Sequence, residues 1–184
     1  IALAVATMIG DGCCAFVSIR LGAGEEEEAH RAVGAGVTLT VLAGLILGAV
    51  YLIWEDPILT AFGARVNAET FDLSREYFFW IALGIPFYMF GQAMNPIIRS
   101  DGSPRFAMAA LLVGAVTNII LDPIFIFVCR WGMMGAAVAT VVGQILSALL
   151  SLWYLAHMKS VKLRRRSFRL DFPLLGRILP LGLT

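Results

Sequence analysis

The stretch GAVTNIILDPIFIF, residues 114–127, decides the fold, because an Asn, an Asp and a Pro interrupt a run that is otherwise mainly apolar. Asn118 and Asp122 are four residues apart, so on a helix they lie on one face, and Pro123 follows directly. An Asp near the centre of a bilayer costs about 2.5 to 3.5 kcal/mol on insertion scales. An acidic residue inside such a run therefore indicates a functional site.

The composition around this stretch is typical of a membrane protein. Of the 184 residues, 59% are hydrophobic and 15% are charged, and the mean hydropathy is +0.83. Soluble domains are roughly half apolar and a quarter charged. In lipid the backbone must satisfy its own hydrogen bonds, and the strict alternation of barrel strands is absent. The sequence therefore predicts an all-α polytopic membrane protein built as a helix bundle.

Five apolar segments are long enough to cross a hydrocarbon core, which takes roughly 20 helical residues. They cover residues 1–20, 32–54, 77–98, 106–129 and 133–156, and a sixth segment begins near residue 173. The chain starts with Ile1 inside the first apolar segment and stops at Thr184 inside the sixth. We therefore expect it to be an internal piece of a longer protein.

The basic residues predict the orientation in the membrane. Eleven of the fourteen Lys and Arg residues lie in or beside the connections 21–31, 99–105 and 157–172. By the positive-inside rule these connections are cytoplasmic, and the turn 129–132 lies outside. Residues 157–172 would form a basic cytoplasmic linker that either attracts anionic lipids, at about 1 kcal/mol per basic residue, or simply fixes the topology. We favour the second interpretation.

Counting along two neighbouring spans places three polar residues near one depth. Asp122 lies seven residues before the outer end of its predicted helix, and Thr140 lies seven residues after the next helix begins. At 1.5 Å per residue both lie roughly 10 Å below the same turn, with Asn118 one helical turn deeper. These oxygen-bearing side chains suit Na⁺ or a proton. The alternative is interhelical hydrogen bonding, worth around 0.6 kcal/mol per bond.

Pro123 predicts a hinge in the helix directly after Asp122. It has no N–H, so the carbonyl of Ile119 loses its usual helical partner and the helix tends to kink. The freed carbonyl could supply another ligand, or the kink could be the point that moves when Asp122 changes protonation.

Four further polar residues lie in or near the spans. Gln92 and Asn95 share a helix face and either line an aqueous cavity or join helices. Tyr77 either hydrogen-bonds the acidic cluster or anchors its helix at the interface. Asp11 lies between two glycines near mid-membrane, and is either a second relay carboxylate or the mark of a hydrated inner vestibule.

The motifs of enzymes and nucleotide-binding proteins are absent from the sequence. It has no HExxH, no nucleophile elbow and no Gly-rich phosphate loop that follows a strand. We therefore expect neither enzymatic activity nor a nucleic-acid partner. We also expect no cofactor other than a coupling ion, and no metal site beyond Na⁺ at Asp122, Asn118 and Thr140.

Three motifs carry a family resemblance: NPIIRSDGSPRFAM at 95–108, GAVTNIILDPIFIF at 114–127, and WGMMGAAVATVVGQ at 131–144. Together they closely resemble the amino-terminal half of multidrug and toxic compound extrusion (MATE) transporters, and they look most like the DinF-like prokaryotic branch. The resemblance implies a twelve-helix protein of two six-helix lobes around a central cavity. This chain would then hold the second to sixth helices of the first lobe and the start of the seventh helix. The first helix, with a further family Asp, would be missing.

The resemblance also implies a function. Similar proteins export cationic, amphipathic compounds in exchange for H⁺ or Na⁺, and their cation-site residues match Asn118, Asp122 and Thr140, with Tyr77 a less certain match. Asp11 departs from the pattern, because small residues are usual at that position. The implied setting is the cytoplasmic membrane of a bacterium or archaeon, with drug-like substrates and a monomeric full-length protein.

Two other functions remain open from the sequence. One is a flippase for a lipid-linked saccharide or another lipid, since the larger superfamily shares this architecture. Such proteins tend to have a cationic cavity, whereas nearly all Lys and Arg residues here lie in loops. The other is a membrane scaffold that transports nothing.

Overall fold

The structure is a computed structural model that describes residues 1–63, 67–158 and 172–182. These residues form helices joined by short turns, and the described part contains no strand. Five helices are long and apolar enough to cross a membrane. They are α1 (Ala2–Gly22), α2 (Glu26–Ile53), α4 (Ala68–Ser100), α5 (Pro104–Pro123), which continues into the π-helix η1 (Ile124–Val128), and α6 (Gly132–Ala156). The predicted all-α membrane bundle is confirmed.

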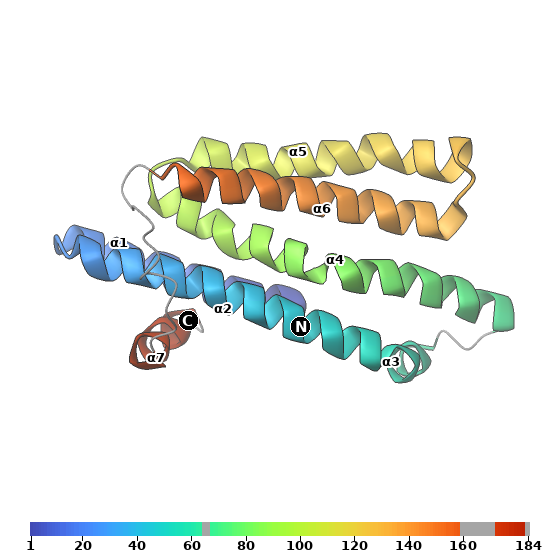
Figure 1. The fold of residues 1–184 in the computed structure, drawn as a ribbon, viewed down its shortest axis with the longest axis horizontal. Coiled ribbons are helices and arrows are strands. Elements are labelled where there is room, and N and C mark those ends of the chain that lie inside the picture. The colour runs from blue at the N-terminus through green and yellow to red at the C-terminus, as the bar shows by residue number, and fades with distance from the viewer. Residues whose placement is uncertain (64–66, 159–171, 183–184) are drawn as a thin grey trace.

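Helix α4 is the centre of the bundle. It contacts α1 and α2 on one side and α5 and α6 on the other, and it crosses the middle of the view between these two pairs (Figure 1). Its core side chains are fully buried, among them Met89, Met94 and Ile97. Many large apolar side chains of the other helices point outward, including Leu45, Ile119 and Leu149, as expected for helices that face lipid.

Two short helices complete the fold. The seven-residue helix α3 (Glu55–Ala61) lies against the start of α4, where Arg75 forms ion pairs of 3.6 Å with Glu55 and with Asp56. Helix α7 (Phe172–Leu181) packs against α1 (Figure 1). The contact is close, because a Cβ on Gly12 would lie 2.4 Å from the carbonyl oxygen of Ile178.

Local signals explain where the long helices start and turn. The side chain of Asn67 accepts a hydrogen bond of 2.7 Å from the backbone N–H of Thr70, which caps α4. Pro104 occupies the first turn of α5, where a missing N–H costs nothing. Gly24 and Gly102 have φ angles of 77° and 78°, and they make the tight turns before α2 and α5.

The observed helices extend beyond some of the predicted spans. Helix α4 begins nine residues before the predicted start at Tyr77, because its capped first turns carry polar residues that a hydropathy count leaves out. Helix α2 likewise begins with a charged turn, Glu26 to Glu28, where negative side chains favour the positive end of the helix dipole. Most of the predicted basic linker, 157–172, lies outside the described residues.

Helices α4, α5 and α6 are joined at their cytoplasmic ends, as the positive-inside rule assigns them. Tyr154 of α6 donates a buried hydrogen bond of 2.7 Å to the carboxyl group of Asp101, the residue that ends α4. The ring of Tyr154 also lies 4.7 Å from that of Phe106 in the first turn of α5. A second bond runs from the amide of Asn95 to the carbonyl oxygen of Ala107, at 3.0 Å. These contacts fix the three helices relative to one another at this end.

Candidate functional site

A polar cluster joins α5 and α6 in the halves of these helices that lie nearest to the turn between η1 and α6. The Nδ2 group of Asn118 donates hydrogen bonds of 3.2 Å to Oδ1 of Asp122 and of 3.2 Å to Oγ1 of Thr140. The hydroxyl of Thr140 in turn lies 3.0 Å from the carbonyl oxygen of Ala136, to which it donates. The structure therefore brings together the three residues that the depth count placed side by side. All three are half-buried.

Two glycines bring the helices that carry this cluster together. A Cβ on Gly114 would lie 2.8 Å from the carbonyl oxygen of Gly143, and a Cβ on Gly143 would lie 2.6 Å from that of Gly114. Neither contact leaves room for a side chain, so the backbones of α5 and α6 meet here. Gly114 precedes Asn118 by one helical turn, which sets the short distance between Asn118 and Thr140.

Pro123 marks a change of helix type directly after Asp122. Helix α5 ends at Pro123, and residues 124–128 form the π-helix η1, in which the N–H of Cys129 bonds to the carbonyl of Ile124 at 2.9 Å. Proline has no N–H to give to the carbonyl of Ile119. Single π-helical turns inside α-helices are frequent at functional sites. The sequence predicts the disturbance at Pro123, and the structure shows that it takes this form.

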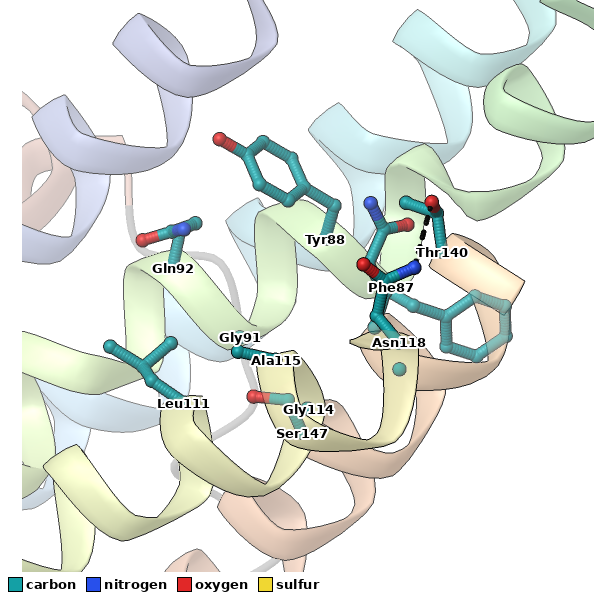
Figure 2. A pocket seen from close by; sticks show the side chains of 12 residues that line it. Phe87, Tyr88, Gly91, Gln92, Leu111, Gly114, Ala115, Asn118, Thr140 and Ser147 are labelled. Carbon is teal, nitrogen blue, oxygen red and sulfur yellow. Dashed lines mark hydrogen bonds between the residues drawn. The ribbon is translucent and has the colours of Figure 1, made fainter. Parts of the chain in front are cut away.

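A cavity of about 210 Å³ opens beside the cluster, between α4, α5 and α6. We call it the polar cavity because polar side chains make up a larger part of its lining than in the cavity next to it. Asn118 and Thr140 lie on its wall, and Figure 2 shows the hydrogen bond between them. Gln92 and Tyr88 of α4 and Ser147 of α6 also line it (Figure 2). Of the two interpretations of Gln92, the structure supports the one in which it lines a cavity.

A larger cavity of about 640 Å³ lies next to the polar one, among the described parts of α1, α2, α3, α4 and α6. Its walls are mainly apolar and aromatic, with Tyr51, Phe62 and Phe78 among the lining residues. The two cavities share Tyr88, Thr140 and Gln144. The polar cluster and the apolar cavity therefore meet at Thr140.

The other predicted site residues lie away from the cluster. Asn95 is 7% exposed and donates to the carbonyl of Ala107, which is the bond between helices that was one of its two interpretations. Tyr77 is half-buried on α4, and its hydroxyl makes no hydrogen bond to a described residue. Asp11 is exposed on α1. The roles of Tyr77 and Asp11 stay predictions.

A family model described as MatE matches residues 1–124, which is about two thirds of the chain. The chain belongs to the MatE family. The fold agrees, because a solved structure described as the inward-facing conformation of a multidrug resistance MATE family transporter of the MOP superfamily is similar over 99% of this chain. The TM-score is 0.91, the sequence identity is 29%, and 41% of that transporter is covered.

Two curated relatives, one from a plant and one from a bacterium, show that similar proteins occur in both groups of organisms. Protein DETOXIFICATION 43 of Arabidopsis thaliana is 37% identical over 78% of the chain and 27% of its own length. Multidrug export protein MepA of Staphylococcus aureus is 29% identical over 84% of the chain and 34% of its own length. The chain thus spans about a quarter to a third of the curated relatives. Because these relatives include a plant protein, the DinF-like prokaryotic branch and the bacterial or archaeal membrane stay predictions.

Sequence reasoning missed Gln144 and Tyr88 of this MatE chain. Gln144 follows Thr140 by four residues, so the same i, i+4 spacing that joined Asn118 to Asp122 would have placed it on the cavity face. Tyr88 carries no such signal, because an aromatic residue in an apolar helix is ordinary. In the part of the chain that the structure describes, no three His, Cys, Asp or Glu residues gather as a transition-metal site would require.

Proposed function

We propose that the full-length protein is a secondary active exporter of cationic, amphipathic compounds, and that it exchanges them for H⁺ or Na⁺ by alternating access. The observation that carries this proposal is the cluster of Asn118, Asp122 and Thr140 beside two cavities that meet at Thr140. An exchanger needs a cation site and a substrate site that influence each other. Residues shared between two cavities supply that influence directly.

The Asn118 amide is the group that would respond to the ion. Its Nδ2 lies 3.2 Å from an oxygen of Asp122 and 3.2 Å from the oxygen of Thr140, so the N–H₂ group points between two oxygens. Rotating the amide by half a turn would exchange this N–H₂ group for Oδ1 and present a third oxygen. A cation bound between three oxygens would then replace the two hydrogen bonds. A proton on Asp122 would instead weaken the bond from Asn118, because a neutral carboxyl is a poorer acceptor.

Pro123 is the proposed hinge of this switch. The π-helix η1 begins directly after it, and the side chain that changes charge, Asp122, directly precedes it. The cytoplasmic ends of α4, α5 and α6 are fastened by Tyr154, Asp101 and Asn95. Movement triggered at Asp122 would therefore be taken up by the outer end of α5.

The apolar cavity supports an amphipathic substrate. Ligand pockets of this kind combine apolar and aromatic walls with a few polar groups, and volumes of 300 to 1,000 Å³ are usual. The cavity of about 640 Å³ has aromatic walls and reaches the polar side chains of Thr140 and Gln144.

The described lining of the two cavities offers no positively charged side chain to a lipid-linked anion. The described residues that line them include no Lys or Arg. A flippase for a pyrophosphate-linked substrate needs positive groups to offset the phosphate charge. The flippase is therefore the weaker of the two functions for this part of the protein.

The test is transport by the full-length protein in proteoliposomes under an imposed pH or Na⁺ gradient. Gradient-driven movement of a fluorescent organic cation is the expected result, and Asp122→Asn should abolish the dependence on the gradient. Asp72→Asn is the matched control, because Asp72 is exposed on α4 away from the cluster. Undiminished transport by Asp122→Asn at normal expression would refute the assignment of the site. Movement of a lipid but of no organic cation would instead favour the flippase.

A further inference from the structure

Gln144 lies at the junction of the two cavities, and its side-chain amide oxygen has no hydrogen-bond partner among the described residues. It is one of three residues that line both the polar and the apolar cavity. Its Oε1 is shielded from solvent, and no described residue donates a hydrogen bond to it. Buried amide oxygens are nearly always satisfied, so an exception in a native fold calls for a partner from outside the chain.

Gly84 of α4 leaves the space that this amide uses. A Cβ on Gly84 would lie 2.6 Å from Oε1 of Gln144 and 2.8 Å from Cγ2 of Val141. Any larger residue would displace the amide from its place between α4 and α6. The oxygen therefore faces a Cα–H group, which is at best a weak hydrogen-bond donor. A stronger donor entering the cavity could draw the amide away from this contact.

The apolar cavity shows what kind of donor would enter. Its walls include Tyr51, Phe62 and Phe78, so the occupant is a flat or bulky apolar body rather than a hydrated ion. Its other polar edge, Thr140, already donates its hydroxyl to the carbonyl of Ala136 and accepts from Asn118. Tyr51 and Tyr88 also bring hydroxyl groups to this wall, but the amide oxygen of Gln144 is the acceptor that is shielded from solvent and lacks a donor among the described residues. It would gain a donor if the amide turned from Gly84 toward the occupant.

We infer that Gln144 is a specificity-determining residue, which selects aromatic cations that carry N–H donors over cations whose nitrogens are fully alkylated. This inference rests on the proposed function, because it takes an organic cation as the occupant of the apolar cavity. An N–H donor satisfies the buried oxygen of Gln144, whereas an N-methyl group leaves it unsatisfied. A site built to receive a hydrogen bond discriminates strongly against an analogue that lacks the donor.

The test compares two permanently charged dyes that differ in the alkylation of their exocyclic nitrogens. The 10-methyl cations of proflavine and acridine orange, called by these two names below, share one flat acridinium ring whose own nitrogen carries a methyl group and no hydrogen. The exocyclic nitrogens are NH₂ groups in proflavine and N(CH₃)₂ groups in acridine orange. Dissociation constants for both dyes are measured by fluorescence with the purified full-length protein in lipid nanodiscs. The decisive quantity is the change in the ratio of the two constants between wild type and variant, because the difference in apolar affinity between the dyes cancels in that comparison.

Replacement of the amide should change this ratio. Gln144→Met keeps the length of the side chain and removes the acceptor, so proflavine should bind about tenfold more weakly and acridine orange less than about twofold. Ile145→Met is the matched control, because it adjoins Gln144 on α6 but lines neither cavity, and the ratio should stay unchanged. If Gln144→Met does not fold, Gln144→Asn withdraws the amide by one methylene, and the same loss for proflavine is expected.

The outcomes separate this inference from the proposed function. If the wild-type protein binds neither dye, the substrate class is wrong and the proposed function loses its support. If both dyes bind and both variants leave the ratio unchanged, Gln144 does not select for N–H donors, while the proposed function stands. Equal weakening of both dyes would also overturn the inference, because it would show a role for Gln144 in packing alone.

Discussion

Asn118 and Thr140 are 22 positions apart in the sequence, yet the amide of one donates to the hydroxyl of the other at 3.2 Å. The polar cluster is therefore a property of the α5 and α6 pair. Asp122 belongs to it only through Asn118, whose single N–H₂ group serves both partners. A change in the distance between the two helices would act directly on the bond to Thr140, and it would reach the bond to Asp122, which lies within α5, only through Asn118.

The hydroxyl of Thr140 can be tested separately from the volume of its side chain. Thr140→Val keeps the shape and removes an oxygen, so we expect roughly tenfold weaker dependence of transport on the coupling ion. Thr140→Ser keeps the oxygen and should retain the dependence. The measurement is transport rate against ion concentration in proteoliposomes, and equal behaviour of the two variants would exclude the hydroxyl as a ligand.

The contact between Gly114 and Gly143 should tolerate no side chain. Alanine at either position would lie less than 3 Å from a backbone oxygen of the other helix, so the helices must separate. We expect a loss of about 1 to 3 kcal/mol in the free energy of unfolding, seen as a lower apparent melting temperature of the purified protein. Gly176→Ala in α7 is the control, because nothing lies within 4 Å of its added Cβ. An unchanged melting temperature for Gly143→Ala would contradict the close packing.

Pro123 should influence the rate of transport more than the stability of the fold. Pro123→Ala restores an N–H that can bond to the carbonyl of Ile119, which would stiffen the helix between Asp122 and η1. We expect slower turnover, about tenfold, with little change in the affinity for the ion or the dye. Pro104→Ala is the control, because Pro104 lies at the start of α5 where the missing N–H has no helical partner. A full-speed Pro123→Ala protein would remove the hinge from the proposal.

The bond between Tyr154 and Asp101 should contribute to stability and not to selectivity. Tyr154→Phe keeps the ring contact with Phe106 and removes the donor to a buried carboxyl group, so we expect a loss of about 1 to 3 kcal/mol. Apparent melting temperature measures the loss, and dye affinities of the folded fraction should stay unchanged. Altered dye affinities would show that this end of the bundle communicates with the cavities.

The orientation in the membrane can be checked with cysteines. Cys129 is exposed in the turn after η1, whereas Cys13 is buried. Two proteins are compared, one with Cys129 as its single cysteine and one with a single cysteine introduced as Ser103→Cys. An impermeant thiol reagent added outside cells should label the first protein and should not label the second. The reverse pattern would invert the topology that the basic residues predict.

Much of the bundle was predictable because its helices are set by hydropathy, which a sequence displays directly. The pairing of Asn118 with Thr140 was predictable because a short turn forces two antiparallel helices to share a depth scale. Gly84 and Gln144 show what a single sequence hides, since their relationship arises between α4 and α6, which approach each other only in the folded chain. The first turns of α4 were missed because a polar cap, and not hydropathy, starts that helix.

The π-helix after Pro123 has one further consequence. A π-turn holds one residue more than an α-turn, so α5 and η1 together behave like an α-helix that has received a one-residue insertion. Removing one residue from 124–128 should therefore convert η1 to ordinary α-helix, while the residues beyond it keep their orientation relative to Asp122. The rings of Phe125 and Trp131, which now lie 5.2 Å apart, should stay in contact when Ile126 is the residue removed. A deletion from an ordinary α-helix would instead rotate everything beyond it by about 100°.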